Sequence, residues 1–428
     1  MRFISRILRN ILSLLLLLAL AAGAVWLITQ SRPRPAPAAP VQQSPLATPT
    51  QPPSIPLVPS PTPTQAAPPT QLTPTQSAAN LDNYVFGEPQ VVLTHTAAIG
   101  IVGWLPGDKE LLLTLRQPGT TTENIETFNV ITGERHVYGN RHGIDVPPIW
   151  LEAVGRVAFT TLAGQEIDLW ISGHGDALAH EPTLRNVNWA ITGLQDRVIL
   201  LDRDERRLVL TNETGQSVQT VPVDLYALGF DPDNSLSHFR MASHPSRQMV
   251  ALYDSTHFVI VNQETGKLLQ IDLGRTASED LGYGPRWAYH ARWSPDGRRL
   301  ALLTTVGEPI VSSTELTVVN TESGISSQIP LGTRYVYDIA WAPTGHHLVA
   351  LGQASMVEGR TLVGLYLVDV LTGETRRMLP NEHVELEASA QAVRWSVGGQ
   401  ALALLCPHRL QEEPPRGESR LCLLKVDD

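Results

Sequence analysis

The first 80 residues of this 428-residue chain contain no Asp or Glu, and the first acidic residue is Asp82. They include five arginines, so residues 82–428 hold 27 Lys and Arg against 42 Asp and Glu, a net charge of −15. Nucleic-acid-binding proteins need a basic face to displace phosphate counterions, so no nucleic-acid partner is expected. The basic start also argues against a soluble cytoplasmic enzyme that begins at Met1.

Recognisable catalytic and metal-binding motifs are missing as well. The 13 His are scattered, with no His-Glu-x-x-His and no Cys-x-x-Cys, so a zinc site has no support. No Gly-x-Ser-x-Gly elbow, phosphate loop or dinucleotide fingerprint occurs. We therefore predict no catalytic residue, no metal ligand and no cofactor.

An uncharged apolar run lies near the N-terminus, and we predict a transmembrane signal-anchor helix over residues 11–29. At about 1.5 Å per residue it approaches the roughly 30 Å of a hydrocarbon core. Three arginines precede it, which places the short basic segment 1–10 in the cytoplasm and the body outside. A cleaved signal peptide is the alternative, because the small residues ending at Ala24 fit a cleavage site and would give a secreted protein.

Residues 30–82 are rich in Pro, Thr and Gln, and 15 of the 33 prolines lie between Pro33 and Pro74. Such a composition cannot build a packed core, so we predict a disordered linker. It is interpreted as a spacer that holds the body away from the membrane. An SH3 ligand and a glycosylated stalk are the alternatives.

The body, residues 83–428, repeats one motif about every fifty residues. Its clearest copy runs from Trp293 through Pro295 and Gly297 into an apolar stretch. Further copies contain Trp341, Pro343 and Gly345, then Trp395, and weaker ones begin at Trp104, Trp150, Trp189 and Ser243. This spacing is typical of a four-stranded propeller blade.

Each repeat unit can be interpreted as four antiparallel strands joined by tight turns. Pro-Asp-Gly supplies the first turn, and a Thr-Gly or Ser-Gly pair supplies a second turn, between the third and fourth strands. The last unit lacks a fourth strand, and residues 89–94 at the start of the body look like that strand. We predict an all-β, seven-bladed propeller closed by both chain ends, with six or eight blades as alternatives and the Trp150 unit as the weakest.

The Trp293 copy, Trp-Ser-Pro-Asp-Gly-Arg-Arg-Leu-Ala-Leu, resembles the repeat of TolB-like propellers, which are similar to WD-repeat proteins. The resemblance implies an exported, often envelope-associated domain that interacts with other proteins. The repeat residues are structural, so the resemblance carries over no catalytic or binding residue. Unlike soluble periplasmic TolB, this chain has an anchor and a spacer, and it shows no separate N-terminal α/β domain.

Two groups of side chains are candidates for specific roles. The motif tryptophans are predicted to pack between blades. An aromatic group near the starts of two inner strands is the candidate binding surface, with packing in the core as its alternative; it comprises Tyr283, Trp287, Tyr289, Tyr335 and Tyr337. These residues adjoin long loops rich in Glu, and such a face suits a protein segment, a cationic ligand or a sugar.

Cys406 and Cys422 are the only cysteines, and they flank a hairpin in the last unit. Export would permit a cross-strand disulfide, while two buried reduced thiols are the alternative.

These features together favour a membrane-tethered, extracytoplasmic propeller, periplasmic or extracellular, that acts as a non-catalytic module. It would bind or scaffold another protein or a cell-envelope component. The alternative is a propeller enzyme, a hydrolase or lyase with a metal-dependent site in its central channel. A sensor ectodomain is less favoured, because the segment before the membrane has no room for a signalling domain.

Overall fold

The computed structural model describes most of the body. The described residues are 81–143, 146–174, 181–188, 190–202, 207–231, 239–245, 249–254, 257–271, 273, 287–306, 313–333, 335–357, 360–378, 384–385, 391–406, 408–409 and 418–427. The predicted cytoplasmic segment, the anchor helix and nearly all of the linker lie outside these residues. No helix within the described part of the chain is long and apolar enough to cross a membrane.

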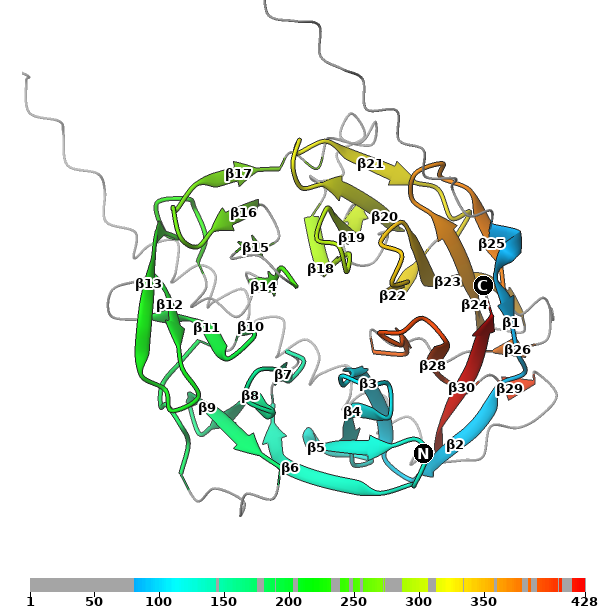
Figure 1. Ribbon diagram of the computed structural model, residues 1–428, viewed down its shortest axis with the longest axis horizontal. Coiled ribbons are helices and arrows are strands. Elements are labelled where there is room, and N and C mark those ends of the chain that lie inside the picture. The colour runs from blue at the N-terminus through cyan, green and yellow to red at the C-terminus, as the bar shows by residue number, and fades with distance from the viewer. Residues whose placement is uncertain are drawn as a thin grey trace, which may run out of the picture. The chain divides into compact units, whose positions relative to one another are not determined.

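The described residues form a ring of small antiparallel sheets around a central axis (Figure 1). Blade 1 contains β3 (Ala98–Trp104), β4 (Glu110–Arg116), β5 (Thr122–Asn129) and β6 (Arg135–His142). Blade 2 contains β7 (Ile149–Leu151), β8 (Arg156–Ala163) and β9 (Glu166–Gly173). Blade 3 contains β10 (Thr192–Leu194), β11 (Arg197–Asp202), β12 (Arg207–Thr211) and β13 (Ser217–Asp224). Blade 4 contains β14 (Arg240–Ser243), β15 (Met249–Tyr253), β16 (Phe258–Asn262) and β17 (Leu268–Gln270).

The ring continues through three more blades. Blade 5 contains β18 (Trp287–Trp293), β19 (Arg299–Val306), β20 (Ser313–Asn320) and β21 (Ser326–Ile329). Blade 6 contains β22 (Val336–Trp341), β23 (His347–Val357), β24 (Arg360–Asp369) and β25 (Thr375–Arg377). Blade 7 contains β27 (Val393–Trp395), β28 (Ala401–Leu405) and β30 (Ser419–Asp427), to which β1 (Val85–Phe86) and β2 (Gln90–His95) are added. Outside the blades are the short 3-10 helix η1 (Leu81–Asn83) and the pair β26 (Val384–Glu385) and β29 (His408–Arg409). The predicted seven-bladed, all-β propeller is thus confirmed.

Both ends of the body meet in blade 7, as predicted. β2 pairs antiparallel with β30 along Gln90 to His95, and β1 pairs with the far end of the same strand. Figure 1 shows these blue and red strands side by side. Because the N-terminal strands occupy the outer edge of β30, that edge is not left open for another chain.

The hydrophobic core consists of layers between neighbouring blades. One cluster joins blades 4 and 5, where Ala251 and Leu302 are fully buried, and similar clusters join the other neighbouring blades. The largest cluster spans blades 6, 7 and 1 and includes Leu81 and Tyr84 from the start of the body. Second strands such as β19 are buried on both faces, which explains their unbroken apolar sequence.

Blade 2 departs most from the four-strand pattern. It has three named strands, and a single bridge between Leu169 and Leu184 stands at the place of a fourth. The sequence unit that begins at Trp150, predicted as the weakest, still forms a separate blade.

Candidate functional site: the central channel

Three of the motif tryptophans connect their blade to the one before it. The indole Nε1 of Trp293 donates a hydrogen bond to the carbonyl of Ala242 in blade 4 at 2.8 Å. Trp341 donates in the same way to Arg292 in blade 5 at 2.9 Å, and Trp104 donates to the carbonyl of Arg394 in blade 7 at 3.2 Å. Each indole N–H thus bonds a backbone carbonyl on the inner strand of the preceding blade.

Four repeat positions differ from this pattern, and one of them is Ser243 in blade 4. Trp395 donates within its own turn, to the carbonyl of Gly399 at 2.9 Å. The buried Nε1 of Trp150 has no hydrogen-bond partner among the described residues. In blade 3 the repeat position is occupied by Thr192. Thr192 pairs with Ile199, seven residues later in the chain, just as Trp293 pairs with Leu300 in blade 5. Trp189, which the sequence placed there, lies outside the described residues.

The turns that follow the tryptophans also contact one another around the ring. Gly297 has a φ of +67°, and a Cβ there would lie 1.7 Å from Nε2 of His244 in the turn of blade 4. Gly345 has a φ of +76°, and its Cβ would lie 2.9 Å from Cγ of Asp296 in the turn of blade 5. Pro295 and Pro343 are exposed at the corners of these turns. The glycines are therefore required both by backbone conformation and by the close approach of the neighbouring blade.

The aromatic group predicted as a binding surface is only partly described. Tyr283 lies outside the described residues, and for Trp287 only its backbone, paired with Thr305, is described. Tyr335 and Tyr337 are half-buried with ring centroids 6.5 Å apart. Tyr289 donates a hydrogen bond to the carbonyl of Val336 at 2.8 Å, which ties blade 5 to blade 6.

Burial raises the pKa of the Tyr289 phenol, and it raises the pKa of Tyr337 as well. Tyr289 also lines the central channel described below. Of this aromatic group, the structure brings Tyr289 to the channel. The Glu-rich long loops lie largely outside the described residues.

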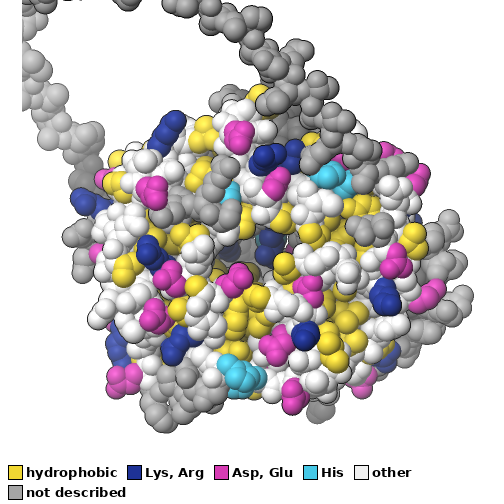
Figure 2. All heavy atoms as spheres, viewed as in Figure 1, with side chains coloured by type: hydrophobic (Ala, Val, Ile, Leu, Met, Phe, Trp, Pro, Cys, Tyr) yellow, Lys and Arg dark blue, Asp and Glu magenta, His cyan; other side chains and the backbone are white. Residues whose placement is uncertain are grey.

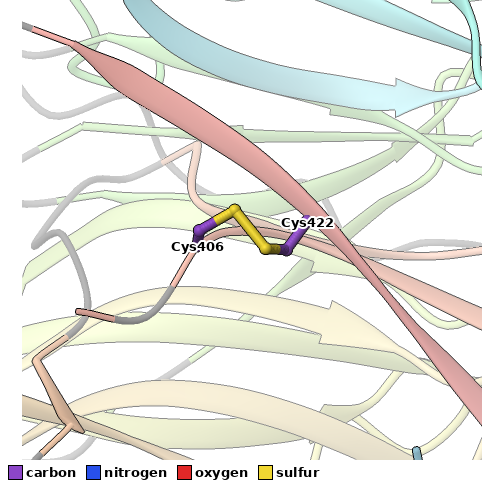
Figure 3. The surroundings of a disulfide bond; sticks show 2 residues. All are labelled: Cys406 and Cys422. Atoms are coloured by element: carbon purple, nitrogen blue, oxygen red, sulfur yellow. A yellow bond between two sulfur atoms is a disulfide. The ribbon is translucent and has the colours of Figure 1, made fainter. Parts of the chain in front are cut away.

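Cys406 and Cys422 form a disulfide that joins β28 to β30 (Figure 3). Their Cα atoms lie 4.9 Å apart, and both residues are buried. The backbone N–H of Cys406 donates to the carbonyl of Arg420 at 2.8 Å, so the bond lies within a hydrogen-bonded part of the blade.

A channel with a volume of about 700 Å³ lies at the centre of the ring. Figure 2 shows it as a hollow with Lys or Arg side chains inside it. Residues from β3, β7, β14 and β18 line it, among them Trp104, Trp150, Arg240, Arg292 and Trp293. The channel therefore combines apolar and aromatic walls with a few charged groups, a composition typical of ligand sites.

A polar network crosses the inner strands beside this channel. Nε of Arg292 donates to Nε2 of His290 at 3.1 Å, so this histidine nitrogen carries no proton. The same nitrogen lies 3.6 Å from Oδ1 of Asp338 in blade 6, and Oδ2 of Asp338 accepts from Nη1 of Arg394 in blade 7 at 2.6 Å. Nε of Arg394 in turn donates to the carbonyl of Val102 in blade 1 at 2.8 Å.

Asp338 is fully buried, and its carboxylate is already well supplied with donors. Oδ2 accepts the backbone N–H groups of Ala392 and Val393 as well as Arg394, and Oδ1 accepts the N–H of Ile339. This carboxylate therefore holds blades 6 and 7 together.

Burial shifts the pKa values of three ionisable groups in and beside this network. Burial lowers the pKa of His290 well below its usual value, and the charges of Arg292, Arg394 and Arg240 lower it further. Burial, followed by the charge of Arg394, lowers the pKa of Arg292 to about 10. Burial raises the pKa of Tyr253 to about 12, although Arg240 and Arg292 oppose this shift.

The sequence reasoning did not identify these channel residues. The signal available was an arginine directly before the motif tryptophan in two copies, Arg292-Trp293 and Arg394-Trp395. Side chains alternate along a strand, so neighbours of a packed tryptophan point elsewhere. The positions of His290 and Asp338 carry no comparable signal in the sequence.

No protein-family model and no curated protein matches this chain. Among solved structures, an oligogalacturonate lyase in complex with manganese is 12% identical, covers 80% of this chain and 97% of its own, and has a TM-score of 0.49. An oligogalacturonate lyase from Vibrio parahaemolyticus is 12% identical, with coverages of 81% and 97% and a TM-score of 0.46. A hydrazine synthase from Kuenenia stuttgartiensis is 10% identical, with coverages of 71% and 73% and a TM-score of 0.38. The fold assignment therefore rests on the strand pairing given above, and the activities of these proteins are not transferred.

Proposed function

We propose that this chain is a membrane-tethered, extracytoplasmic binding module. Residues 11–29 would anchor it, residues 30–82 would hold the propeller away from the bilayer, and the central channel would receive part of a protein or cell-envelope component. The composition of the N-terminal 82 residues supports the tether, and the channel supports the binding role.

The observation that carries the binding role is the chemistry of the channel lining. Its charged groups are arginines, which neither lose a proton readily nor act as nucleophiles. His290 already accepts a hydrogen bond from Arg292, and its lowered pKa makes it a poor general base near neutral pH. Such a lining favours holding a ligand over transforming it.

The alternative enzyme would use a divalent metal ion in the channel. Among the described residues no group of three or more His, Cys, Asp and Glu side chains is placed to hold one. His290 and Asp338 do approach each other, but Arg292 and Arg394 flank them and would repel a cation. The donor set near the channel therefore suits an anion better than a metal ion.

A photo-crosslinking experiment in cells that make the full-length chain tests the binding role. The photoreactive amino acid p-benzoylphenylalanine replaces Pro245, which is exposed and lines the channel. The matched control replaces Ile131, which is 70% exposed at the hairpin between β5 and β6. We expect a discrete adduct from position 245 and none from position 131. Equal labelling at both positions, or none at 245, would contradict the proposal.

The tether is tested separately by fractionation and protease treatment. We expect the full-length chain in the membrane fraction, and its propeller to be degraded by protease added to intact spheroplasts. Protection of the propeller until the cells are lysed would contradict the extracytoplasmic assignment.

A further inference from the structure

Positive charge is concentrated beside the channel. Arg240, Arg292 and Arg394 act together on His290, and Asp338 is the carboxylate that lies within this group. This positive charge lies at the centre of a body whose net charge is −15. Local positive potential in an acidic protein needs an explanation, because like charges repel strongly where water is excluded.

Arg292 is the clearest case. Its Nε binds His290, but its Nη2 is buried and has no hydrogen-bond partner among the described residues. Asp338 lies closer to Arg394 than to Arg292, and its Oδ2 accepts a hydrogen bond from Nη1 of Arg394 at 2.6 Å. Nη2 of Arg394, a residue only 6% exposed, is also buried without a partner among the described residues. Buried donors of charged groups normally have hydrogen-bond acceptors. Two guanidinium nitrogens without an acceptor therefore indicate that an acceptor, supplied by a ligand, is missing.

Resting on the binding function proposed above, we propose that the channel binds an oxyanion group of its ligand, a carboxylate or a phosphate, at Arg292 with Arg240 alongside. A guanidinium presents parallel N–H donors that match the paired oxygens of such groups. Both arginines line the channel, and the network to His290 fixes the orientation of Arg292 before the ligand arrives.

The remaining lining suits the rest of the ligand. Trp104, Trp293 and Tyr289 supply aromatic surface in the same cavity. Tyr289 is held by its bond to the carbonyl of Val336, so its ring is fixed at the channel wall. An elongated ligand with an anionic group and an apolar or sugar-like portion would contact both parts of the channel.

Thermal denaturation of the full-length chain in detergent tests the proposal. The probes are sodium phosphate and sodium acetate, each compared with sodium chloride at equal ionic strength. A ligand that binds only the folded state raises the unfolding midpoint with its concentration. We expect a saturable rise with at least one of the two anions beyond the effect of chloride, and the anion with the larger rise identifies the group as phosphate or carboxylate.

Two variants separate a ligand-binding arginine from a structural one. Arg292→Gln removes the guanidinium, and we expect at least a tenfold weaker anion effect together with an unchanged or higher midpoint in anion-free buffer. Arg377→Gln makes the same charge change at an exposed position of β25, and we expect it to behave like wild type.

The proposal is overturned if neither anion acts beyond chloride, or if Arg292→Gln keeps the wild-type response. A lowered midpoint of Arg292→Gln in anion-free buffer would equally overturn it, because Arg292 would then be serving the fold. The adduct from position 245 is the independent measurement. If it forms while the anion effect is absent, the channel binds a partner and only the oxyanion assignment fails.

Discussion

At the scale of single residues, contacts between blades account for the repeat motif. The motif tryptophans reach back to the preceding blade, and the motif glycines let the preceding turn approach. His244 illustrates the second contact: its ring packs at a tilt against Trp293 with centroids 4.7 Å apart, and its Nε2 lies 3.2 Å from the carbonyl oxygen of Gly297. A residue type is therefore repeated where one blade meets the next.

Gly297→Ala is expected to destabilise the propeller strongly. The new Cβ would overlap His244, whose Nε2 would be 1.7 Å away, and overpacking of this kind costs about 1–3 kcal/mol. The left-handed backbone adds about 1–2 kcal/mol. Gly133→Ala is the matched control, because its φ is +76° but no other side chain or backbone atom lies within 4 Å of where its new methyl group would stand. Urea denaturation that shows equal losses for both variants would contradict this account.

His290 is expected to make stability depend on pH. Its pKa in the folded protein is lowered, so below about 6.5 the unfolded chain binds more protons than the folded one. The free energy of unfolding should therefore fall as the pH decreases from about 7 to 5. His95 and His136, whose pKa values are also lowered by burial, contribute in the same direction.

His290→Gln keeps an acceptor for Arg292 but cannot be protonated, so this variant should lose part of that dependence. Denaturant titrations at several pH values measure it. A variant whose slope between pH 5 and 7 matches that of wild type would show that His290 is not the group responsible.

At the scale of secondary-structure elements, blade 7 carries the closure of the ring. Its outer strands come from the start of the body, and Tyr84 donates or accepts a 3.0 Å hydrogen bond with Nδ1 of His347 in blade 6. Nη2 of Arg376 also donates to the carbonyl of Tyr84 at 2.8 Å. The residues that follow the linker are thus bound to two blades at once.

The disulfide is expected to stabilise this closing blade. Cys406 and Cys422 are 16 residues apart in sequence, and a loop of about that length gives roughly 3 kcal/mol in the chain-entropy account. Reduction with dithiothreitol should lower the free energy of unfolding by about that amount. The variant that carries both Cys406→Ala and Cys422→Ala should be insensitive to dithiothreitol. Free thiols in the untreated protein, detected by mass spectrometry, would contradict the bond.

Sequence reasoning reached the fold because the propeller repeats its turn chemistry. Trp, Pro and Gly recur at fixed distances, and the missing fourth strand at the C-terminus pointed to the N-terminal strand that replaces it. Blade 3 shows the limit: Thr192 occupies the repeat position, and its hydroxyl bonds Ser243 in blade 4 at 3.1 Å. The sequence analysis assigned the repeat position to Trp189 instead, because a pair of hydroxyl groups leaves no distinctive pattern in the sequence.

The channel could not be predicted in the same way. Its network joins His290, Asp338 and Arg394 from three blades, and their meeting depends on the curvature of the ring. Only the arginines that precede Trp293 and Trp395 carry a local signal. Tyr289 of the predicted aromatic group lies in the channel lining, but the charged residues around it were not anticipated.

At the scale of the whole molecule, the distribution of charge is the property that matters most. An acidic body encloses a channel whose charged lining is basic (Figure 2). The net negative charge of the body would repel free anions. The channel would retain an anionic group whose ligand also makes favourable contacts with the rest of the lining. This arrangement favours a selective binding module over an indiscriminate anion binder.

The most direct test of the account is an anomalous-scattering experiment on crystals of the protein soaked in sodium selenate. Selenate is a tetrahedral oxyanion whose selenium is located directly by its own anomalous signal. The account predicts an anomalous peak in the central channel, with an oxygen atom about 3 Å from Nη2 of Arg292. Selenate peaks at other sites, with an ordered but peak-free channel, would contradict it.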